Sequence, residues 1–235
     1  INALKRMQYA YICFHAAKLG KKLGYKKISV IEYGVAGGQG LLILEDHILE
    51  IEKYFNIEID IYGFDTGEGL PEPVDYRDLP YHWKKGFYSM NQKNLRDKLK
   101  KSKLIIGNID ETSLNFFKDH NPSPIGAVIH DFDFYSSTKT ALKMMNDNER
   151  FFLPRVFSYF DDTIGNELEL YNDYTGERLA INEFNKINNN IKICTPYHLR
   201  ALKPEVWHYQ IWICHFFKHP KYNDFVSNEI QKLEI

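Results

Sequence analysis

Acidic residues follow the apolar segments of this sequence so regularly that they are the first candidates for chemistry. They stand at Glu32, at Asp65, in the run 107–111, at Asp131 with Asp133, and at Asp161 with Asp162. Each follows a short apolar segment typical of a buried strand, and in open α/β sheets the ligand-binding residues lie at the carboxyl ends of the strands. The pattern therefore predicts one acidic site along one edge of a sheet.

A glycine-rich loop directly after Glu32 carries Gly34, Ala36 and Gly38, and small residues let a ligand approach the backbone closely. The loop matches neither the dinucleotide-binding fingerprint nor a P-loop. Glu32 would repel a pyrophosphate but suits an ammonium group, and Asp65 can accept both hydroxyls of a ribose. These residues favour a nucleoside that carries an amino-acid-like cation. A tight turn without a ligand, and an aspartate that caps its own loop, are the alternatives.

The second acidic group consists of Asp131, Asp161 and Asp162. Adjacent strands that end at these positions bring three carboxylates close together, and like charges at short range raise one another's pKa unless a cation neutralises them. A set of oxygen ligands suits Mg²⁺, Ca²⁺ or Mn²⁺ rather than zinc. The alternative is that the pair at 161–162 only caps the next helix.

The spacing of apolar residues predicts the elements that must position these side chains. Helices are expected over 3–23, 41–54, 91–101, 137–148 and 178–188, and strands over 28–33, 57–64, 104–107, 127–130, 156–160, 191–195 and 206–217. Alternating strands and helices are typical of a parallel sheet with right-handed crossovers, whereas the short connection 196–205 favours an antiparallel last pair. The sequence predicts a doubly wound, mainly parallel seven-stranded α/β sheet with an antiparallel strand at its C-terminal end.

We expect one domain over 1–235, with an N-terminal helix within 1–24 and a long loop over 65–90. The loop is rich in proline and glycine, and it mixes aromatic and basic groups with His82. Such a loop can close over a substrate as a lid, exclude water and supply a base. The alternative is a surface loop packed by its own aromatic side chains.

The composition excludes several classes of function. A hydrophobic content of 44% supports a sizeable core, and a formal net charge of -1 gives no general electrostatic footprint for a nucleic acid or an anionic membrane. No apolar run approaches the roughly 20 residues that span a bilayer. Three scattered cysteines predict neither a disulfide framework nor a zinc knuckle, so we expect a reducing, cytoplasmic setting.

Four motifs occur in order along the chain. They are Glu32-Tyr33-Gly34-Val35-Ala36-x-Gly38, Gly63-Phe64-Asp65-Thr66-x-Glu68-Gly69-Leu70-Pro71, Asp131-x-Asp133-x-Tyr135-x-Ser137-Thr138, and Asp161-Asp162. The chain resembles, over residues 25–190, the macrocin O-methyltransferase-like (TylF-type) family of class I S-adenosylmethionine-dependent methyltransferases. The second and third motifs are specific to that family, whereas many methyltransferases share the glycine loop.

The resemblance implies S-adenosylmethionine as the cofactor and a Rossmann-like class I methyltransferase fold. It places the glycine loop and Glu32 on the methionine part of the cofactor and Asp65 on the ribose. The segment after the third strand lies along the adenine in such proteins, which here indicates Ile109 and Asp110.

The resemblance further implies a divalent cation, usually Mg²⁺, bound by Asp131, Asp161 and Asp162. Related catechol-type enzymes place a lysine base three residues after the first metal-binding aspartate, but this chain has Phe134 there. The catalytic candidates are therefore Asp131 and His82.

Together the residues and the resemblance predict a metal-assisted O-methyltransferase. Its partner would be a small-molecule hydroxyl acceptor, such as a sugar, a glycoside or another polyol, with no nucleic acid and no membrane. A metal-independent methyltransferase or an N-methyltransferase on the same fold, and a non-enzymatic relative that binds S-adenosylmethionine, are the alternatives. The sequence leaves a homo-oligomer open.

Overall fold

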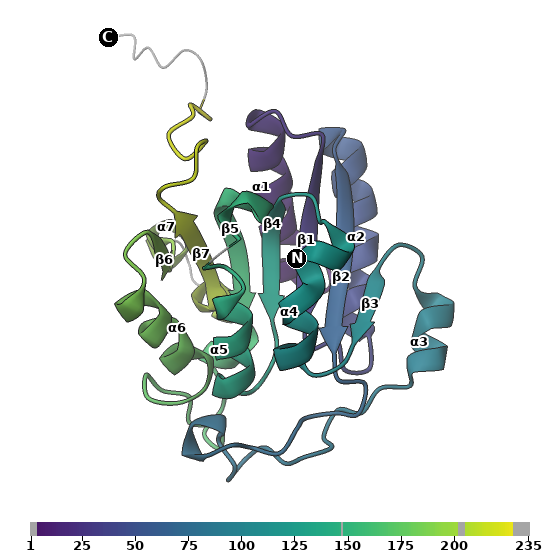
Figure 1. The fold of residues 1–235 in the computed structure, drawn as a ribbon, viewed down its shortest axis with the longest axis vertical. Helices are drawn as coiled ribbons and strands as arrows, with labels where there is room; N and C mark the ends of the chain where they lie inside the picture. Colours follow the sequence, from purple (N-terminus) through teal and green to yellow (C-terminus); the bar gives the residue numbers. More distant parts are fainter. Residues whose placement is uncertain (1–3, 147, 202–204, 228–235) are drawn as a thin grey trace.

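The computed structural model describes residues 4–146, 148–201 and 205–227, so the predicted domain and first helix extend beyond the described residues. Seven strands form one sheet in the order β3-β2-β1-β4-β5-β7-β6. They are β1 (Lys27–Tyr33), β2 (Glu58–Asp65), β3 (Lys103–Ile106), β4 (Ile125–His130), β5 (Phe152–Phe160), β6 (Ile191–Cys194) and β7 (Ile211–Phe216). β1 to β5 pair in parallel, and β7 pairs antiparallel with both β5 and β6. The predicted fold class is confirmed, and the reversed strand lies second from the edge (Figure 1).

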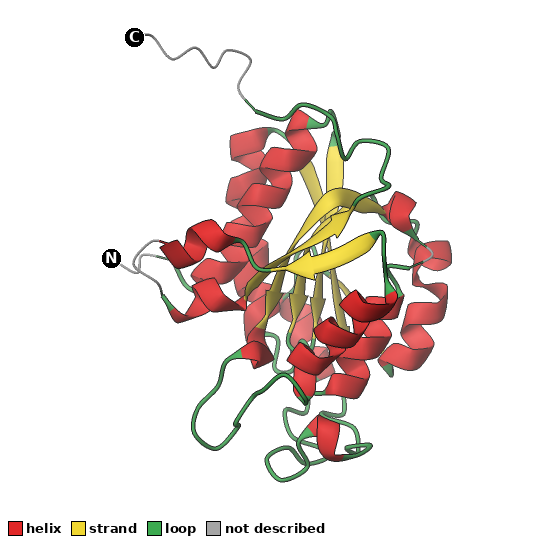
Figure 2. Cartoon of the chain, turned by 90° about the vertical axis from the view of Figure 1, so that its left-hand side faces the viewer, coloured by secondary structure: helices red, strands yellow, loops and turns green. Residues whose placement is uncertain are grey.

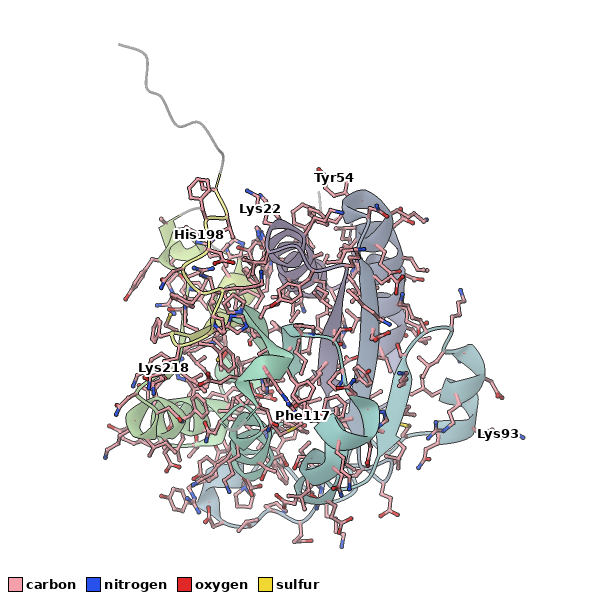
Figure 3. All side chains as sticks on the ribbon, turned by 45° about the horizontal axis from the view of Figure 1, so that its top comes forward. Lys22, Tyr54, Lys93, Phe117, His198 and Lys218 are labelled. Atoms are coloured by element: carbon pink, nitrogen blue, oxygen red, sulfur yellow. The ribbon has the colours of Figure 1, made fainter. Side chains whose placement is uncertain are left out.

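Helices cover both faces of this sheet. One face carries α1 (Met7–Lys22) and α2 (Gln39–Phe55), and the other carries α4 (Ile109–His120), α5 (Tyr135–Lys143) and α6 (Gly176–Ile187). Figure 2 shows the twisted sheet between these two layers. Two short helices, α3 (Gln92–Lys98) and α7 (Tyr197–Ala201), lie at the margins, and Lys93 of α3 points away from the molecule (Figure 3). No helix in the described ranges is long and apolar enough to cross a membrane.

The helix α1 shows why the layers form where they do. Its residues Ile12, Cys13 and Ala16 are buried against the sheet, because they recur on one face at helical spacing. The positive charges of Lys21 and Lys22 in the last turn interact favourably with the negative end of the helix dipole. The periodicity of the sequence therefore predicted this element correctly.

Several segments differ from the sequence-based expectation, including α7, which lies in the expected short connection 196–205, and α5, which ends before residue 148. The helix α4 was not predicted, because its buried residues, Ile109, Phe116 and Phe117, leave most of its surface polar. Its start carries a usable signal, since the Asn108 side chain accepts a hydrogen bond from the Asp110 amide at 3.0 Å. The last predicted strand was too long: residues Val206–Gln210 form a 3-10 helix, and only Ile211–Phe216 belong to the sheet.

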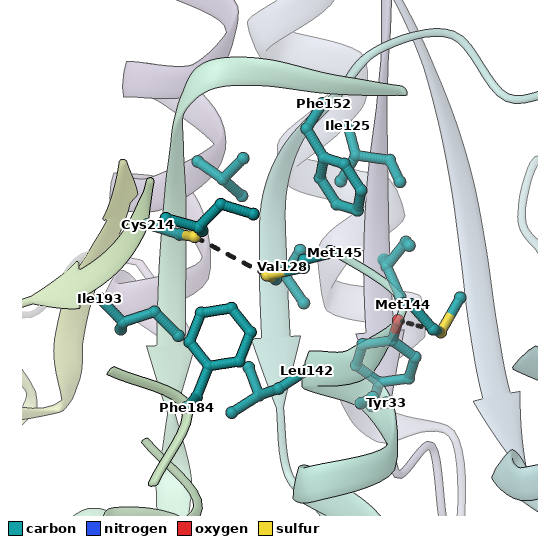
Figure 4. Close-up of a cluster of buried hydrophobic side chains, with 14 of the residues drawn as sticks. Tyr33, Ile125, Val128, Leu142, Met144, Met145, Phe152, Phe184, Ile193 and Cys214 are labelled. Atoms are coloured by element: carbon teal, nitrogen blue, oxygen red, sulfur yellow. Dashed lines mark hydrogen bonds between the residues drawn. The ribbon is translucent and has the colours of Figure 1, made fainter. Parts of the chain in front are cut away.

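A cluster of buried apolar side chains packs between the sheet and the helices α4, α5 and α6 (Figure 4). The Tyr33 hydroxyl donates to the sulfur of Met144 at 3.2 Å, and the Cys214 thiol lies 3.7 Å from the sulfur of Met145. These polar atoms are satisfied by soft sulfur acceptors inside the core. The first of these contacts joins the end of β1 to the C-terminal end of α5.

The register of the sheet aligns the ends of the central strands. Near the ends of these strands, Tyr33 of β1 pairs with Phe64 of β2 and with His130 of β4, and His130 pairs with Phe160 of β5. The residues that come next are Gly34, Asp65, Asp131 and Asp161, and they emerge along one edge. The long loop crosses beneath this edge in Figure 1. The sheet therefore brings together the acidic residues that the sequence singled out.

Candidate active site

A cavity of about 450 Å³ lies at this edge, a volume typical of a small-molecule site. Eight of the predicted site residues line it: Glu32, Gly34, Ala36, Asp65, Ile109, Asp131, Asp161 and Asp162. The lining does not include Gly38, His82 or Asp110. Both predicted halves of the site, the glycine loop and the carboxylate group, thus share one cavity.

The glycine loop is held by close backbone packing. Gly34 has φ 78°, and a Cβ there would lie 1.7 Å from the carbonyl oxygen of Asp131. A Cβ on Gly38, which has φ 84°, would lie 2.2 Å from the side chain of Leu95. The first glycine lets the loop pass directly over the end of β4, and the second lets α3 pack beneath it. Gly38 therefore shapes the loop from outside the cavity.

Glu32 is a buried carboxylate with one oxygen left open. Its side chain is 1% exposed, and Oε1 accepts a hydrogen bond from the Tyr9 hydroxyl at 3.0 Å. Oε2 has no hydrogen-bond partner in the described part of the chain. Burial raises the pKa of Glu32 to about 7, against the lowering effects of the Tyr9 hydrogen bond and Arg6. A buried carboxylate oxygen without a donor fits an incoming ammonium group.

Asp65 is held in place by two backbone amides. Its Oδ2 accepts from Ala36 at 2.8 Å, and its Oδ1 accepts from Gly67 at 2.6 Å. Burial raises the pKa of Asp65, and these amide hydrogen bonds oppose that effect. Each oxygen keeps a second lone pair, so the carboxylate can still accept hydroxyl groups from a ligand. The arrangement fits the predicted contact with a ribose.

The segment after β3 contributes Gly107, Asn108 and Ile109 to the cavity wall. Ile109 is buried as the first residue of α4 and offers an apolar surface to a ligand. Asp110 is exposed instead, and its Oδ1 accepts a hydrogen bond from the Thr140 hydroxyl at 2.7 Å. The helix that the sequence did not predict therefore turns Asp110 out of the cavity.

The cavity also contains an acidic group of Asp131, Asp161 and Asp162. Burial and the charges of Asp161 and Asp162 raise the pKa of Asp131 well above its ordinary value. The pKa of Asp162 is raised to about 7 by burial and by Asp161. Its two oxygens accept hydrogen bonds from the Asp133 amide at 2.9 Å and the Tyr171 hydroxyl at 2.6 Å. The predicted crowding of carboxylates is present.

The chemistry of these oxygen donors suits a hard cation, but their arrangement does not yet form a metal centre. No group of three or more His, Cys, Asp or Glu side chains is placed to hold a metal ion within 4–146, 148–201 and 205–227. Asp162 is engaged by Asp133 and Tyr171, and Asp161 by the hydroxyl of Tyr159. The pair does not cap the next helix either, because the N-cap of α6 is Thr175.

The long loop is anchored along part of its length. Leu79 and Trp83 pack against Phe134, and Asp78 accepts hydrogen bonds from the backbone and the hydroxyl of Ser136 at 2.8 and 2.9 Å. This segment is therefore tied to the start of α5. The part that follows, 84–90, is mostly exposed. It carries Tyr88, which lines the cavity.

His82 lies behind the cavity wall. Its Nε2 is 3.8 Å from Oε1 of Glu169, and Glu169 does line the cavity. His82 therefore contacts the cavity lining through Glu169 and through the neighbouring Trp83, whose ring centroid lies 4.3 Å from its own. The sequence did not identify Glu169, because it lies in an irregular segment with no motif around it.

Arg6 is another lining residue that sequence reasoning missed. It precedes α1, and its guanidinium donates to the Tyr9 hydroxyl at 2.8 Å and lies 3.9 Å from Oδ2 of Asp131. Its position depends on how α1 docks onto the sheet, which no local motif encodes.

Of the comparisons with known proteins, only the one with solved structures bears on the fold. No protein-family model and no curated sequence matches the chain. Among solved structures, the chain is similar to the calicheamicin methyltransferase CalS11, with 19% identity and a TM-score of 0.60 over 91% of this chain and 81% of that chain. An apo structure of CalS11, named a TDP-rhamnose 3'-O-methyltransferase, gives 18% identity and a TM-score of 0.53 over the same shares. At these identities the likeness shows the Rossmann-like α/β fold alone.

Proposed function

We propose that this chain is an S-adenosylmethionine-dependent O-methyltransferase that acts on a hydroxyl of a sugar, a glycoside or another polyol. One observation carries the proposal: one cavity brings together Glu32, whose buried Oε2 has no hydrogen-bond partner among the described residues, the fixed carboxylate of Asp65, and an acidic chamber formed by Asp131, Asp161 and Asp162. The first two fit the ammonium and the ribose of the cofactor. The similarity in fold to CalS11, whose name states a sugar O-methyltransferase, supports this assignment.

On the cofactor side, the residues of this chain would bind and orient S-adenosylmethionine. S-adenosylmethionine, when bound, supplies a methyl group on a positively charged sulfur. Glu32 would bind the ammonium, Asp65 the ribose hydroxyls, and Ile109 would pack against the adenine. Gly34 lets the glycine loop pass directly over the Asp131 carbonyl. The loop and the two carboxylates would thereby fix the direction in which the methyl group faces.

On the acceptor side, the acidic chamber would hold a hydroxyl compound in line with the methyl group. Such alignment can contribute about 7–11 kcal/mol toward a reaction barrier. Asp131 lines the cavity and would accept a hydrogen bond from the acceptor hydroxyl. His82 would act as a positioning residue through Glu169, not as a base in contact with the acceptor.

Metal assistance is part of this proposal. A divalent ion on Asp131, Asp161 and Asp162 would supply a Lewis acid that lowers the pKa of the acceptor hydroxyl. The carboxylates are of the right chemical type, but the side chains as placed do not converge on one point. We therefore derive no catalytic step through a metal. The same observation, with Arg6 beside Asp131, favours a metal-independent transferase as the second candidate.

A mass-spectrometric screen tests the proposal. The chain is incubated with S-adenosylmethionine and a panel of nucleotide sugars, glycosides and catechols, in Mg²⁺ or in a chelator. We expect one polyol to gain a methyl group, with loss of the product in Asp65→Ala and its retention in Asp97→Asn, an exposed site on α3. Product formed equally in chelator identifies the metal-independent form. Absence of any methylated product, together with no binding of the cofactor, contradicts the proposal.

A further inference from the structure

Arg6 brings a cation into a cavity whose other charged groups are carboxylates. Seven acidic side chains line the cavity: Glu32, Asp65, Asp131, Asp133, Asp161, Asp162 and Glu169. Within the described residues, Arg6 is the one basic side chain in that lining. A ligand that carries a carboxylate would be repelled by this wall unless a cation lay beside it. Arg6 is the group that can accommodate such a ligand.

The hydrogen bonds around Arg6 place it next to Glu32. The guanidinium donates to the Tyr9 hydroxyl at 2.8 Å, and this hydroxyl donates to Oε1 of Glu32 at 3.0 Å. The guanidinium also lies over the Tyr9 ring, 5.0 Å from its centroid. One tyrosine therefore holds a cation and an anion side by side in the same wall.

Both charged groups keep capacity for a ligand. Oε2 of Glu32 has no partner in the described part of the chain. Among these residues the Arg6 guanidinium makes one hydrogen bond, to Tyr9, although it carries five donor hydrogens. The guanidinium lies 3.9 Å from Oδ2 of Asp131, so the two groups form an ion pair but no hydrogen bond. Arg6 also keeps 35% of its side chain exposed, so a ligand can reach it.

We infer that Arg6 and Glu32 form a subsite for a zwitterion, in which Arg6 binds the carboxylate and Glu32 binds the ammonium of the amino-acid end of the cofactor. This inference rests on the proposed function. Guanidinium and carboxylate groups match in a two-point geometry, which an ammonium donor cannot reproduce. The subsite selects a cofactor with an intact amino-acid end over analogues that lack its carboxylate.

Three ligands separate the two charges of that end in a calorimetric test. S-adenosylhomocysteine carries both charges, its decarboxylated analogue keeps only the ammonium, and methylthioadenosine carries neither. In Arg6→Ala, S-adenosylhomocysteine should bind about 10- to 100-fold more weakly, the loss of one charge-assisted contact. The other two ligands should bind as they do to the wild-type chain. The matched control Arg96→Ala, an exposed arginine on α3, should change none of the three affinities.

The outcomes separate the inference from the proposed function. An equal loss of affinity for all three ligands in Arg6→Ala, or no loss for any of them, overturns the subsite. If the wild-type chain binds none of the three, the proposed function fails as well. Arg6→Lys keeps the charge but not the two-point geometry, so it should lose part of the affinity for S-adenosylhomocysteine alone. If thermal melting shows that Arg6→Ala does not fold, the Arg6→Lys variant tests the subsite instead.

Discussion

Replacing Asp162 by asparagine should stabilise the ligand-free protein at about pH 8 and have much less effect at about pH 5. The pKa of Asp162 is raised from 3.8 to about 7, first by burial and then by the charge of Asp161. Because the folded-state pKa lies above that of the unfolded chain, the folded protein binds the proton more tightly. The group therefore contributes stability at low pH, and this contribution is lost as the pH rises through about 7.

The magnitude follows from those two pKa values. Their difference, about 3, corresponds to a loss of about 4 kcal/mol in the free energy of unfolding at high pH. Between about 2 and 3 kcal/mol of this loss occurs as the pH rises from 5 to 8. Asparagine keeps an acceptor for only one of the two donors, Asp133 and Tyr171, which costs about 1–2 kcal/mol at either pH. Relative to wild type, the variant should gain about 5–10 °C in melting temperature between these pH values, at about 2–4 °C per kcal/mol.

Thermal melts of both proteins in a chelator at the two pH values provide the assay. Chelation matters because a bound cation would neutralise the cluster and hide the repulsion. Asp97→Asn, on the exposed side of α3, is the control and should follow wild type. If Asp162→Asn and wild type lose stability in parallel between pH 5 and pH 8, the carboxylates do not repel as described.

Three further predictions concern the cofactor half and the loop. Asp65→Ala should weaken binding of S-adenosylhomocysteine by about 1–3 kcal/mol in calorimetry, and an unchanged affinity would remove Asp65 from the site. Gly34→Ala should destabilise the fold by at least about 2 kcal/mol in denaturant titration, because its Cβ would clash with the Asp131 carbonyl at a positive φ; a near-neutral effect would contradict the tight loop packing. Protease nicking within 84–90 should slow when cofactor and acceptor are bound, and equal rates would indicate a static surface loop.

The sheet and the acidic edge could be predicted from the sequence because both follow from local patterns. Apolar segments that end at Glu32, Asp65, Asp131 and Asp161 share one edge once parallel pairing is inferred. The helix α4 escaped prediction because it buries few residues, and packing against α5 decides its presence. The strand expected from residue 206 was shortened by a 3-10 turn that apolar content alone does not reveal.

The direction of individual side chains could not be predicted in the same way. His82 was expected to face a substrate, but it does not line the cavity and contacts Glu169 instead, in a loop that Asp78 ties to Ser136. Arg6 enters the cavity because α1 packs across β4 and β5, a contact between distant segments. Both outcomes depend on tertiary contacts that no spacing along the chain specifies.

A crystal structure with S-adenosylhomocysteine tests the central claim most directly. We predict electron density for the ligand in the cavity, with the ribose hydroxyls on Asp65, the adenine beside Ile109, and the amino-acid end between Glu32 and Arg6. Density for the ligand elsewhere, or an empty cavity at saturating ligand concentration, would contradict the assignment of this cavity as a methyltransferase active site.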